Sequence, residues 1–289
     1  MLSPGTKQKL LGYQKDEITE HCIYRRLAVM QKSPENRRVL ERIADDEKRH
    51  YERWRAWTGV DVAPNRLEAR LFGWMARMLG LTFAVKLMER GETSARQAYA
   101  DLAAEVEGAE IIAREEGDHE DALLAMLDEE RLRYVGSIVL GLNDALVELT
   151  GVLAGLTLAL QNTKLIALTG SITGIAAAFS MAASEYLSTK TEGGAQSPLK
   201  AALYTGVTYV LTVILLILPY LLLGNFYVAL ACTLATAVSI IAVFNYYISV
   251  AKSLSFRRRF AEMAGLSLGV AALSFLVGLA LRAFLGVDV

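Results

Sequence analysis

Two copies of a Glu-x-x-His pattern are the residues of this sequence best suited to metal chemistry. Glu47 and His50 form one copy, and Glu116 and His119 form the other. A spacing of three residues puts a carboxylate and an imidazole on one face of a helix, so both side chains can reach one metal centre. A single copy is a weak signal, because a solvated or salt-bridged helical face gives the same pattern. Two copies in one chain favour a metal site.

Both copies fall on the apolar stripe of a predicted helix. Apolar residues recur at alternating steps of three and four in residues 35–58 and again in residues 109–126, and the Glu and His positions continue these steps. Carboxylates buried in a helical bundle are costly unless a cation, a base or a shifted pKa compensates. A bound metal ion is one way to compensate the acids on these stripes.

Two further predicted helices, residues 10–27 and 81–104, add inward carboxylates. Four helices that each contribute an acid, two of them as Glu-x-x-His, provide the ligand set for a pair of iron or manganese ions. The ligand types do not distinguish Fe²⁺ from Mn²⁺. The pattern leaves open which of Glu89 and Glu92 bridges the metals, and whether the bundle forms within one chain or by exchange of helices across a dimer. The candidate ligands are Glu17, Glu20, Glu47, His50, Glu89, Glu92, Glu116 and His119.

His21 lies four residues after Glu17 on the same predicted face. It is either an extra ligand or a half-buried, hydrogen-bonded histidine, and the sequence favours neither.

Charge divides the chain into two parts. Residues 134–289 hold only 14 charged side chains, while residues 1–133 hold the rest and all three histidines. The net charge of -1, with basic and acidic residues mixed, argues against nucleic acid as a partner. Cys22 and Cys232 fall in different parts, so they suggest neither a disulfide framework nor a four-cysteine metal site.

The apolar part is predicted to span a membrane, because runs of the required length, about 20 residues, recur along it. Lys and Arg crowd the span ends that share a side with the N-terminal part, which places that part in the cytoplasm and the C-terminus outside. We expect an integral protein of a prokaryotic inner or plasma membrane. Five long buried helices of a soluble protein would not explain the charge asymmetry. The predicted spans are residues 134–160, 165–188, 201–223, 226–250 and 263–285.

Acids inside the predicted spans mark a second candidate site. Asp144 and Glu148 are one turn apart in the first span, and Met181 and Glu185 are one turn apart in the second. Ionisable residues within spans are costly and usually mark a pathway, although Glu185 also fits an interfacial position. Oxygen and thioether ligands together suit Fe²⁺ better than an alkali ion. All four side chains could face one cavity.

Residues 66–78 alternate basic and large apolar side chains. A basic amphipathic segment beside a membrane domain can lie on the lipid surface. The alternative, which we favour slightly, is a crossover connection that packs on the bundle.

The N-terminal ligand pattern resembles the ferritin-like, rubrerythrin-type family over most of residues 1–133. An internal repeat agrees with this, since "EITEHCIYRRLA" and "ETSARQAYADLA" each precede a Glu-x-x-His helix. The resemblance implies a four-helix bundle that holds a di-iron site with Fe²⁺ and Fe³⁺ states. No rubredoxin-type cysteine pairs follow, so the electron-fed peroxidase cycle of a full rubrerythrin is not implied.

The segments "GLNDALVELTGVLAG" and "AAAFSMAASEYLS" resemble the first two spans of the vacuolar iron transporter family. This resemblance implies proton-coupled movement of Fe²⁺ and Mn²⁺ out of the cytoplasm by a homodimer whose pathway lies between the subunits. Asp144 and Met181 match the pore metal site, with Glu148 and Glu185 as neighbours. Over its whole length the chain resembles the membrane-bound ferritins, which join the two modules.

The sequence therefore predicts an all-α protein with a ferritin-like domain in residues 1–133 and a five-span domain in residues 134–289. Residues 109–126 are expected to continue into the first span as one helix. The predicted function is iron export from the cytoplasm, with an N-terminal domain that captures, senses or oxidises iron. The alternative is a membrane-anchored ferroxidase or peroxide-scavenging enzyme whose spans only tether it.

Overall fold

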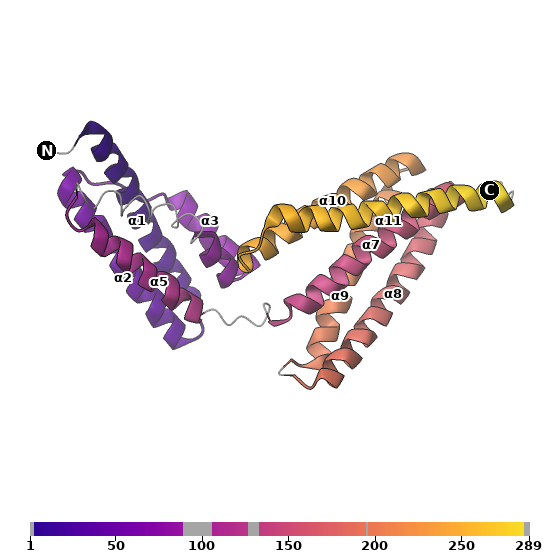
Figure 1. The fold of residues 1–289 in the computed structure, drawn as a ribbon, viewed down its shortest axis with the longest axis horizontal. Coiled ribbons are helices and arrows are strands. Elements are labelled where there is room, and N and C mark those ends of the chain that lie inside the picture. Colours follow the sequence, from indigo (N-terminus) through magenta and orange to yellow (C-terminus); the bar gives the residue numbers. More distant parts are fainter. Residues whose placement is uncertain (1–2, 89–105, 127–132, 195, 286–289) are drawn as a thin grey trace. The chain divides into compact units, whose positions relative to one another are not determined.

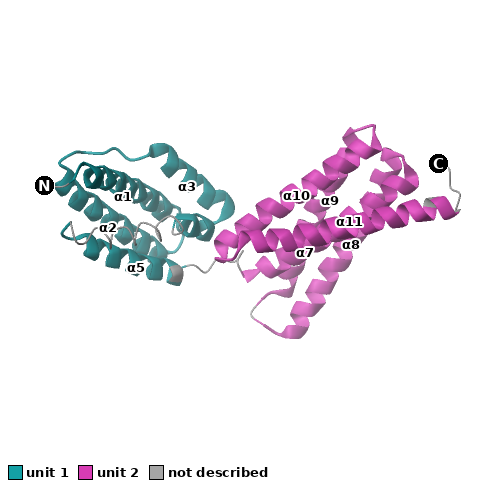
Figure 2. Ribbon diagram, turned by 45° about the horizontal axis from the view of Figure 1, so that its top comes forward, with its two compact units in different colours: residues 1–129 teal, residues 130–289 magenta. Residues whose placement is uncertain are grey.

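The computed structural model describes residues 3–88, 106–126, 133–194 and 196–285. The chain divides into two compact units, Met1–Glu129 and Glu130–Val289 (Figure 2). All regular structure in the described residues is helical, which confirms the predicted fold class at that level. The expected helix from residue 109 into the first span crosses residues 127–132, which lie outside the described residues.

Unit 1 contains helices whose ends follow from local sequence (Figure 1). Ser3 and Ser33 each accept a hydrogen bond from a backbone N–H in the first helical turn, and a proline follows each serine. Gly59 ends one helix in the left-handed conformation, at φ 70°. The helices are α1 (Pro4–Met30), α2 (Pro34–Thr58), α3 (Arg66–Leu79) and α5 (Ala109–Met126), and residues 81–88 are helical as well.

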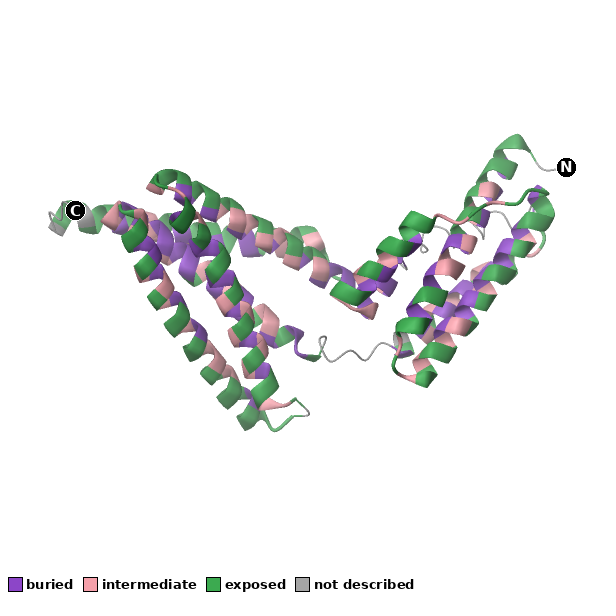
Figure 3. Ribbon diagram, turned by 180° about the vertical axis from the view of Figure 1, so that it is seen from behind, coloured by how far each residue is buried: buried purple, intermediate pink, exposed green. Residues whose placement is uncertain are grey.

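Two apolar clusters lie toward opposite ends of α1, α2 and α5. Helices α1 and α5 run from the first cluster to the second, whereas α2 runs from the second to the first, so inward residues midway along the three helices meet in one layer. Buried positions recur along these helices (purple in Figure 3). The first cluster contains Leu10, Trp54, Val106, Ala109 and Ile112. The second includes Ile23, Tyr24, Leu27, Leu40, Ile43, Leu123 and Met126.

The predicted helix over residues 81–104 is described only in its first part. Ala84, Val85 and Met88 are buried in the second apolar cluster, so this first part of the helix packs in the interior of unit 1. Glu89 and Glu92 lie outside the described residues. A complete four-helix bundle therefore stays a prediction.

Among its described residues, unit 2 has five helices that are long and apolar enough to cross a membrane, in agreement with the predicted number of spans. The last helix begins at Phe256, not near residue 263 as the apolar pattern predicted. The basic residues Arg257, Arg258 and Arg259 continue the helix, because charged side chains at a span end interrupt the apolar run without interrupting the backbone. The helices are α7 (Val135–Leu160), α8 (Thr163–Glu192), α9 (Pro198–Leu222), α10 (Phe226–Ala251) and α11 (Phe256–Leu285).

Helix α7 packs against the other four helices of unit 2, and small residues bring two of them close. A side-chain carbon on Gly141 would lie 2.4 Å from the carbonyl oxygen of Thr205 in α9. One on Gly278 in α11 would lie 2.5 Å from the carbonyl oxygen of Gly155. These contacts require glycine, and they fix the rotation of α7 about its own axis. The faces that carry Asp144 and Glu148 are thereby also fixed.

Candidate metal centre and membrane carboxylates

Four buried side chains from three helices converge in unit 1, in the layer between the two apolar clusters. Glu17 comes from α1, Glu47 and His50 from α2, and Glu116 from α5. Each offers one ligand atom, and these atoms all lie within 4.8 Å of one another. Within the described residues this is the group whose carboxylate and imidazole atoms could hold a metal ion, and its chemistry is compatible with iron or manganese.

His50 occupies the centre of this group. Its Nδ1 lies 3.2 Å from Glu116 Oε1, 3.3 Å from Glu47 Oε2 and 3.4 Å from Glu17 Oε2. Three carboxylates thus surround a single ring nitrogen. The same atoms could surround a metal ion, because nitrogen and carboxylate oxygen are both ligands of iron and manganese.

His119 adjoins the group from α5. Its Nδ1 lies 3.1 Å from Glu47 Oε1 and 3.8 Å from Glu116 Oε2, and its ring stacks on that of His50 with 5.8 Å between centroids. Glu47 therefore reaches both imidazoles. We call Glu17, Glu47, His50, Glu116 and His119 the Glu/His cluster.

The outer nitrogen of each imidazole is held by a carboxylate from the opposite helix. His50 Nε2 lies 2.8 Å from Glu115 Oε2 on α5, and His119 Nε2 lies 3.1 Å from Asp46 Oδ2 on α2. Such a contact fixes the ring orientation and tautomer so that Nδ1 faces inward, as in the carboxylate–histidine–metal arrangements of metalloproteins. Arg49 bridges the two outer carboxylates, with an ion pair to Asp46 and a 3.7 Å contact to Glu115.

Sequence reasoning missed Asp46 and Glu115. A signal was present, because an acidic residue stands immediately before the glutamate in each Glu-x-x-His copy. It also missed Trp54, whose Nε1 donates a hydrogen bond to Glu17 Oε1 over 3.0 Å. Only helix packing shows that this tryptophan, a member of the apolar stripe, orients a carboxylate.

Without a metal ion, protons supply the positive charge that the Glu/His cluster needs. Burial lowers the pKa of His119, but contacts with Glu116 and Glu47 outweigh it and raise the pKa to about 10. The pKa of His50 is also raised far above its ordinary value, because Glu116, Glu17 and Glu47 outweigh burial. Burial raises the pKa of Glu47, yet contacts with both histidines and Glu17 hold it well below its usual range. Both imidazoles are therefore cationic at neutral pH.

Burial is the largest influence on Glu17 and raises the pKa of its carboxyl well above the usual range. Two buried atoms of the cluster, Glu116 Oε2 and His119 Nδ1, have ion-pair contacts but form no hydrogen bond of good geometry in the described part of the chain. Buried polar atoms without hydrogen bonds are costly, and coordination to a cation would relieve that cost. The donor set and these two atoms fit a bound divalent metal ion.

The remaining N-terminal candidates are either absent from this group of four converging ligands or outside the described residues. Glu20 is half-buried on α1 and is not among the four converging ligands. His21 is half-buried, and its Nδ1 donates to the carbonyl oxygen of Ala44 over 2.6 Å. This geometry favours the hydrogen-bonded histidine over the extra ligand. Glu89 and Glu92 lie outside the described residues.

In unit 2, Asp144 lines a shallow groove of about 420 Å³ on the surface of α7. All the lining residues belong to this one helix, so the groove is open within a single chain. Glu148, one turn further along α7, accepts a hydrogen bond of 2.8 Å from the hydroxyl group of Tyr209 in α9. Tyr209 is buried, and sequence reasoning missed it because a tyrosine in an apolar span carries no distinguishing signal.

The two candidates on α8 are half-buried. Ser137 Oγ of α7 donates to Glu185 Oε1 over 2.5 Å, and Met181 packs against the apolar core of unit 2. The described contacts therefore join Glu185 to the start of α7 and Glu148 to α9. They do not gather the four membrane candidates around one cavity of a single chain.

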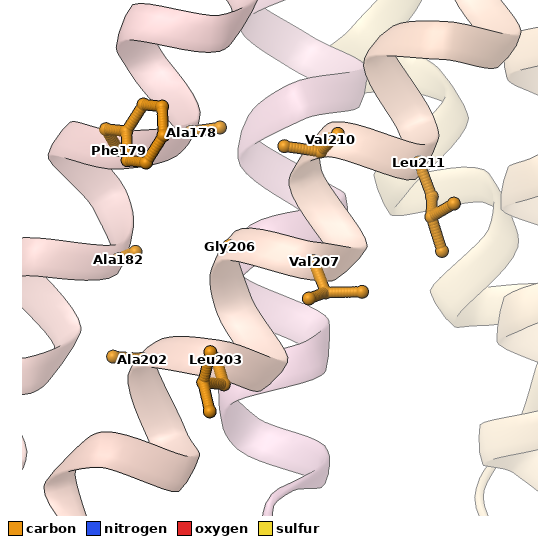
Figure 4. Close-up of a pocket in the computed structure, with 9 residues that line it drawn as sticks. All are labelled: Ala178, Phe179, Ala182, Ala202, Leu203, Gly206, Val207, Val210 and Leu211. Carbon is orange, nitrogen blue, oxygen red and sulfur yellow. The ribbon is translucent and has the colours of Figure 1, made fainter.

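A separate groove of about 310 Å³ lies between α8 and α9 (Figure 4). Its lining is apolar throughout, from Ala178, Phe179 and Ala182 on α8 to the residues of α9 between Ala202 and Leu211. With no ligand atom in its wall, it offers no site for a metal ion.

Comparison with known families gives one finding. Residues 135–195 match the model of the VIT family. The matched segment includes α7 and α8, and with them Asp144, Glu148, Met181 and Glu185. No curated protein matches the chain. Together with the five apolar helices, the match supports an integral membrane protein that transports metal ions such as iron or manganese.

Proposed function

We propose that this protein exports Fe²⁺ from the cytoplasm in exchange for protons, with Mn²⁺ as a second cargo. The observation that carries the proposal is the position of Asp144 and Glu148, two acids one turn apart on α7 within the segment that matches the VIT family. Acids in a span are expensive and usually mark an ion pathway. In this role the two carboxylates alternate between holding metal and holding protons.

The open groove beside Asp144 supports a homodimeric pathway. Its wall consists of α7 alone, so a second copy of α7 facing it would enclose the groove and double its carboxylates. The hydrogen bond from Tyr209 keeps the carboxylate of Glu148 in a fixed orientation. Met181 and Glu185 remain candidates for the same pathway on α8.

Unit 1, proposed to be a ferritin-like domain on the cytoplasmic side, captures, senses or oxidises iron. The Glu/His cluster would hold the metal, with Glu89 or Glu92 as additional ligands. Asp46 and Glu115 orient the imidazoles, and Trp54 orients Glu17. Bound iron would supply one-electron redox chemistry there.

The buried Glu/His cluster also favours a second candidate, a membrane-anchored ferroxidase or peroxide scavenger. The acids of α7 argue against it, because an inert anchor requires no ionisable side chains within its spans.

Fe²⁺ flux into proteoliposomes that contain the full-length protein tests the two candidates. The assay is run under anaerobic, reducing conditions, with and without a pH gradient. Flux that increases when the acceptor interior is acidic supports proton-coupled export. No flux under any gradient, combined with rapid Fe²⁺ oxidation once oxygen is admitted, would contradict the transporter and support the membrane-anchored enzyme.

A further inference from the structure

Helix α3 exposes a broad apolar face. Leu67, Leu71, Trp74 and Met78 follow one another at steps of four, three and four residues, so they share one side of the helix. Each is more than half exposed. The opposite side is buried through small residues, Ala69, Gly73 and Ala76, and packs on α1. The helix thus serves as a packed crossover and still presents large apolar side chains outward.

A stripe of arginines runs beside this apolar face. Arg66, Arg70 and Arg77 of α3 are exposed. Gly73 lies between Arg70 and Arg77 on the same side of the helix, because positions 66, 70, 73 and 77 follow at steps of four, three and four. Arg26 of α1 fills that position, since a side-chain carbon on Gly73 would lie 2.4 Å from Arg26 Cδ. In the described part of the chain none of these four arginines forms an ion pair with an acidic side chain.

The stripe borders a groove of about 780 Å³ between α1 and α3. Its wall combines guanidinium groups with apolar surface. Glu68 is the only acid on α3, and it lies in the first turn, where it accepts a hydrogen bond from Asn65. Arg25 at the groove is paired with Asp45. The basic and apolar lining residues include Arg25, Arg26, Arg70, Arg77, Trp74 and Val29.

We propose that this surface docks unit 1 onto an anionic lipid bilayer. Leu67, Leu71, Trp74 and Met78 would enter the boundary between headgroups and acyl chains, where basic amphipathic helices lie. The arginines would bind lipid phosphates, for which the planar guanidinium is well suited. A bilayer is always within reach, because the spans of the same chain cross it. A weak interaction therefore suffices, since the attachment raises its effective concentration.

The charge of the surface favours lipid over a second copy of this chain. A symmetric contact between two α3 faces would bring the same patch of each copy together. The arginine stripes would then approach each other, and like charges in contact are unfavourable. Anionic headgroups are complementary to the stripe.

The tryptophans allow a direct test in the intact protein. All three, Trp54, Trp57 and Trp74, belong to unit 1, so no span contributes to tryptophan fluorescence. The Trp57→Phe variant retains Trp74 on the proposed surface and Trp54, which is 1% exposed, as a buried reference. It is reconstituted in nanodiscs of phosphatidylcholine with brominated acyl chains, with or without phosphatidylglycerol. Brominated chains quench a tryptophan only when it lies at the membrane.

We expect quenching of Trp74 in the anionic nanodiscs, with loss of that quenching in neutral ones. Quenching should also be lost at about 0.5 M salt, where screening is strong. Adding Arg70→Gln and Arg77→Gln should weaken docking about fivefold for each arginine removed. The matched control, Arg38→Gln with Arg42→Gln, removes two exposed arginines of α2 outside the groove and should change nothing. Unchanged Trp54 emission verifies that each variant is folded.

Three results would overturn the proposal. Trp74 could escape quenching in anionic nanodiscs, or be quenched equally in neutral ones. Trp74 could also escape lipid quenching and yet be protected from acrylamide in a way that depends on protein concentration. That third result would assign the surface to a second copy of the chain.

Discussion

The carboxylates of the two units stand in opposite environments. Those of the Glu/His cluster are buried among three helices, and two imidazoles of the same chain offset their negative charge. Asp144 instead lines an open groove, and Glu148 is exposed with Tyr209 as its hydrogen-bond partner. A site that holds a metal benefits from a complete ligand set, whereas a pathway must let its ion leave. The first arrangement suits retention and the second suits passage.

The largest expected effect is the loss of metal transport when Asp144 is replaced, and it should leave the Glu/His cluster intact. Asp144→Asn removes the charge but retains the shape, so metal flux into proteoliposomes should be lost while metal binding to unit 1 is unchanged. Glu192→Gln, at the exposed end of α8, is the matched control and should retain full flux. Full transport activity in Asp144→Asn would show that Asp144 is not part of the ion pathway.

The reciprocal variant is Glu47→Gln. Glu47 contacts both imidazoles, so its loss should weaken metal binding to unit 1 by more than about 100-fold, above the usual effect of an outer-shell change. Calorimetry with Mn²⁺ on the full-length protein measures this, with the exposed Glu52→Gln on the same helix as control. The maximal rate of flux should persist. Abolished flux would instead show that unit 1 delivers metal as an obligatory step.

Asp46→Asn tests the outer carboxylates. It weakens the contact that holds His119 and should reduce metal affinity about 10- to 100-fold. The neighbouring Asp45→Asn is a close control, because Asp45 is exposed and pairs with Arg25. Equal affinity in the two variants would mean that the ring of His119 is oriented by packing alone.

Metal binding to unit 1 should strengthen as pH rises. The pKa of His119 is raised to about 10, so its imidazole is protonated at neutral pH, and binding requires the neutral ring. Each proton displaced makes affinity rise about tenfold per pH unit below that pKa. Calorimetry in two buffers of different ionisation enthalpy counts the protons released. Binding of Mn²⁺ without proton release would contradict protonated imidazoles in the metal-free Glu/His cluster.

The smallest expected effect is that of Tyr209→Phe. It removes one hydrogen bond to Glu148 and leaves the carboxylate in place, so flux should fall about fivefold, the equivalent of about 1 kcal/mol. Tyr227→Phe, at the exposed start of α10, is the control. If Tyr209→Phe transports at the normal rate, the hydroxyl group does not position Glu148.

Apolar periodicity in the sequence was sufficient to predict α1, α2 and α5, because burial in a bundle imposes apolar steps along a helix. The length of the apolar runs was sufficient to predict the five spans, because a bilayer sets the length of a helix that crosses it. The same stripes identified Glu17, Glu47, His50 and Glu116, since an acid on an apolar face must meet other inward groups. The early start of α11 was missed because Arg257, Arg258 and Arg259 interrupt the apolar run.

Tertiary structure alone decided which groups touch across helices. The pairing of His50 with Glu115, of His119 with Asp46 and of Tyr209 with Glu148 depends on the relative rotation and offset of two helices. Arg26 occupying the gap at Gly73 is a further case. A helical period describes one helix at a time, so residue types and their faces were readable from the sequence, whereas partners required the packed helices.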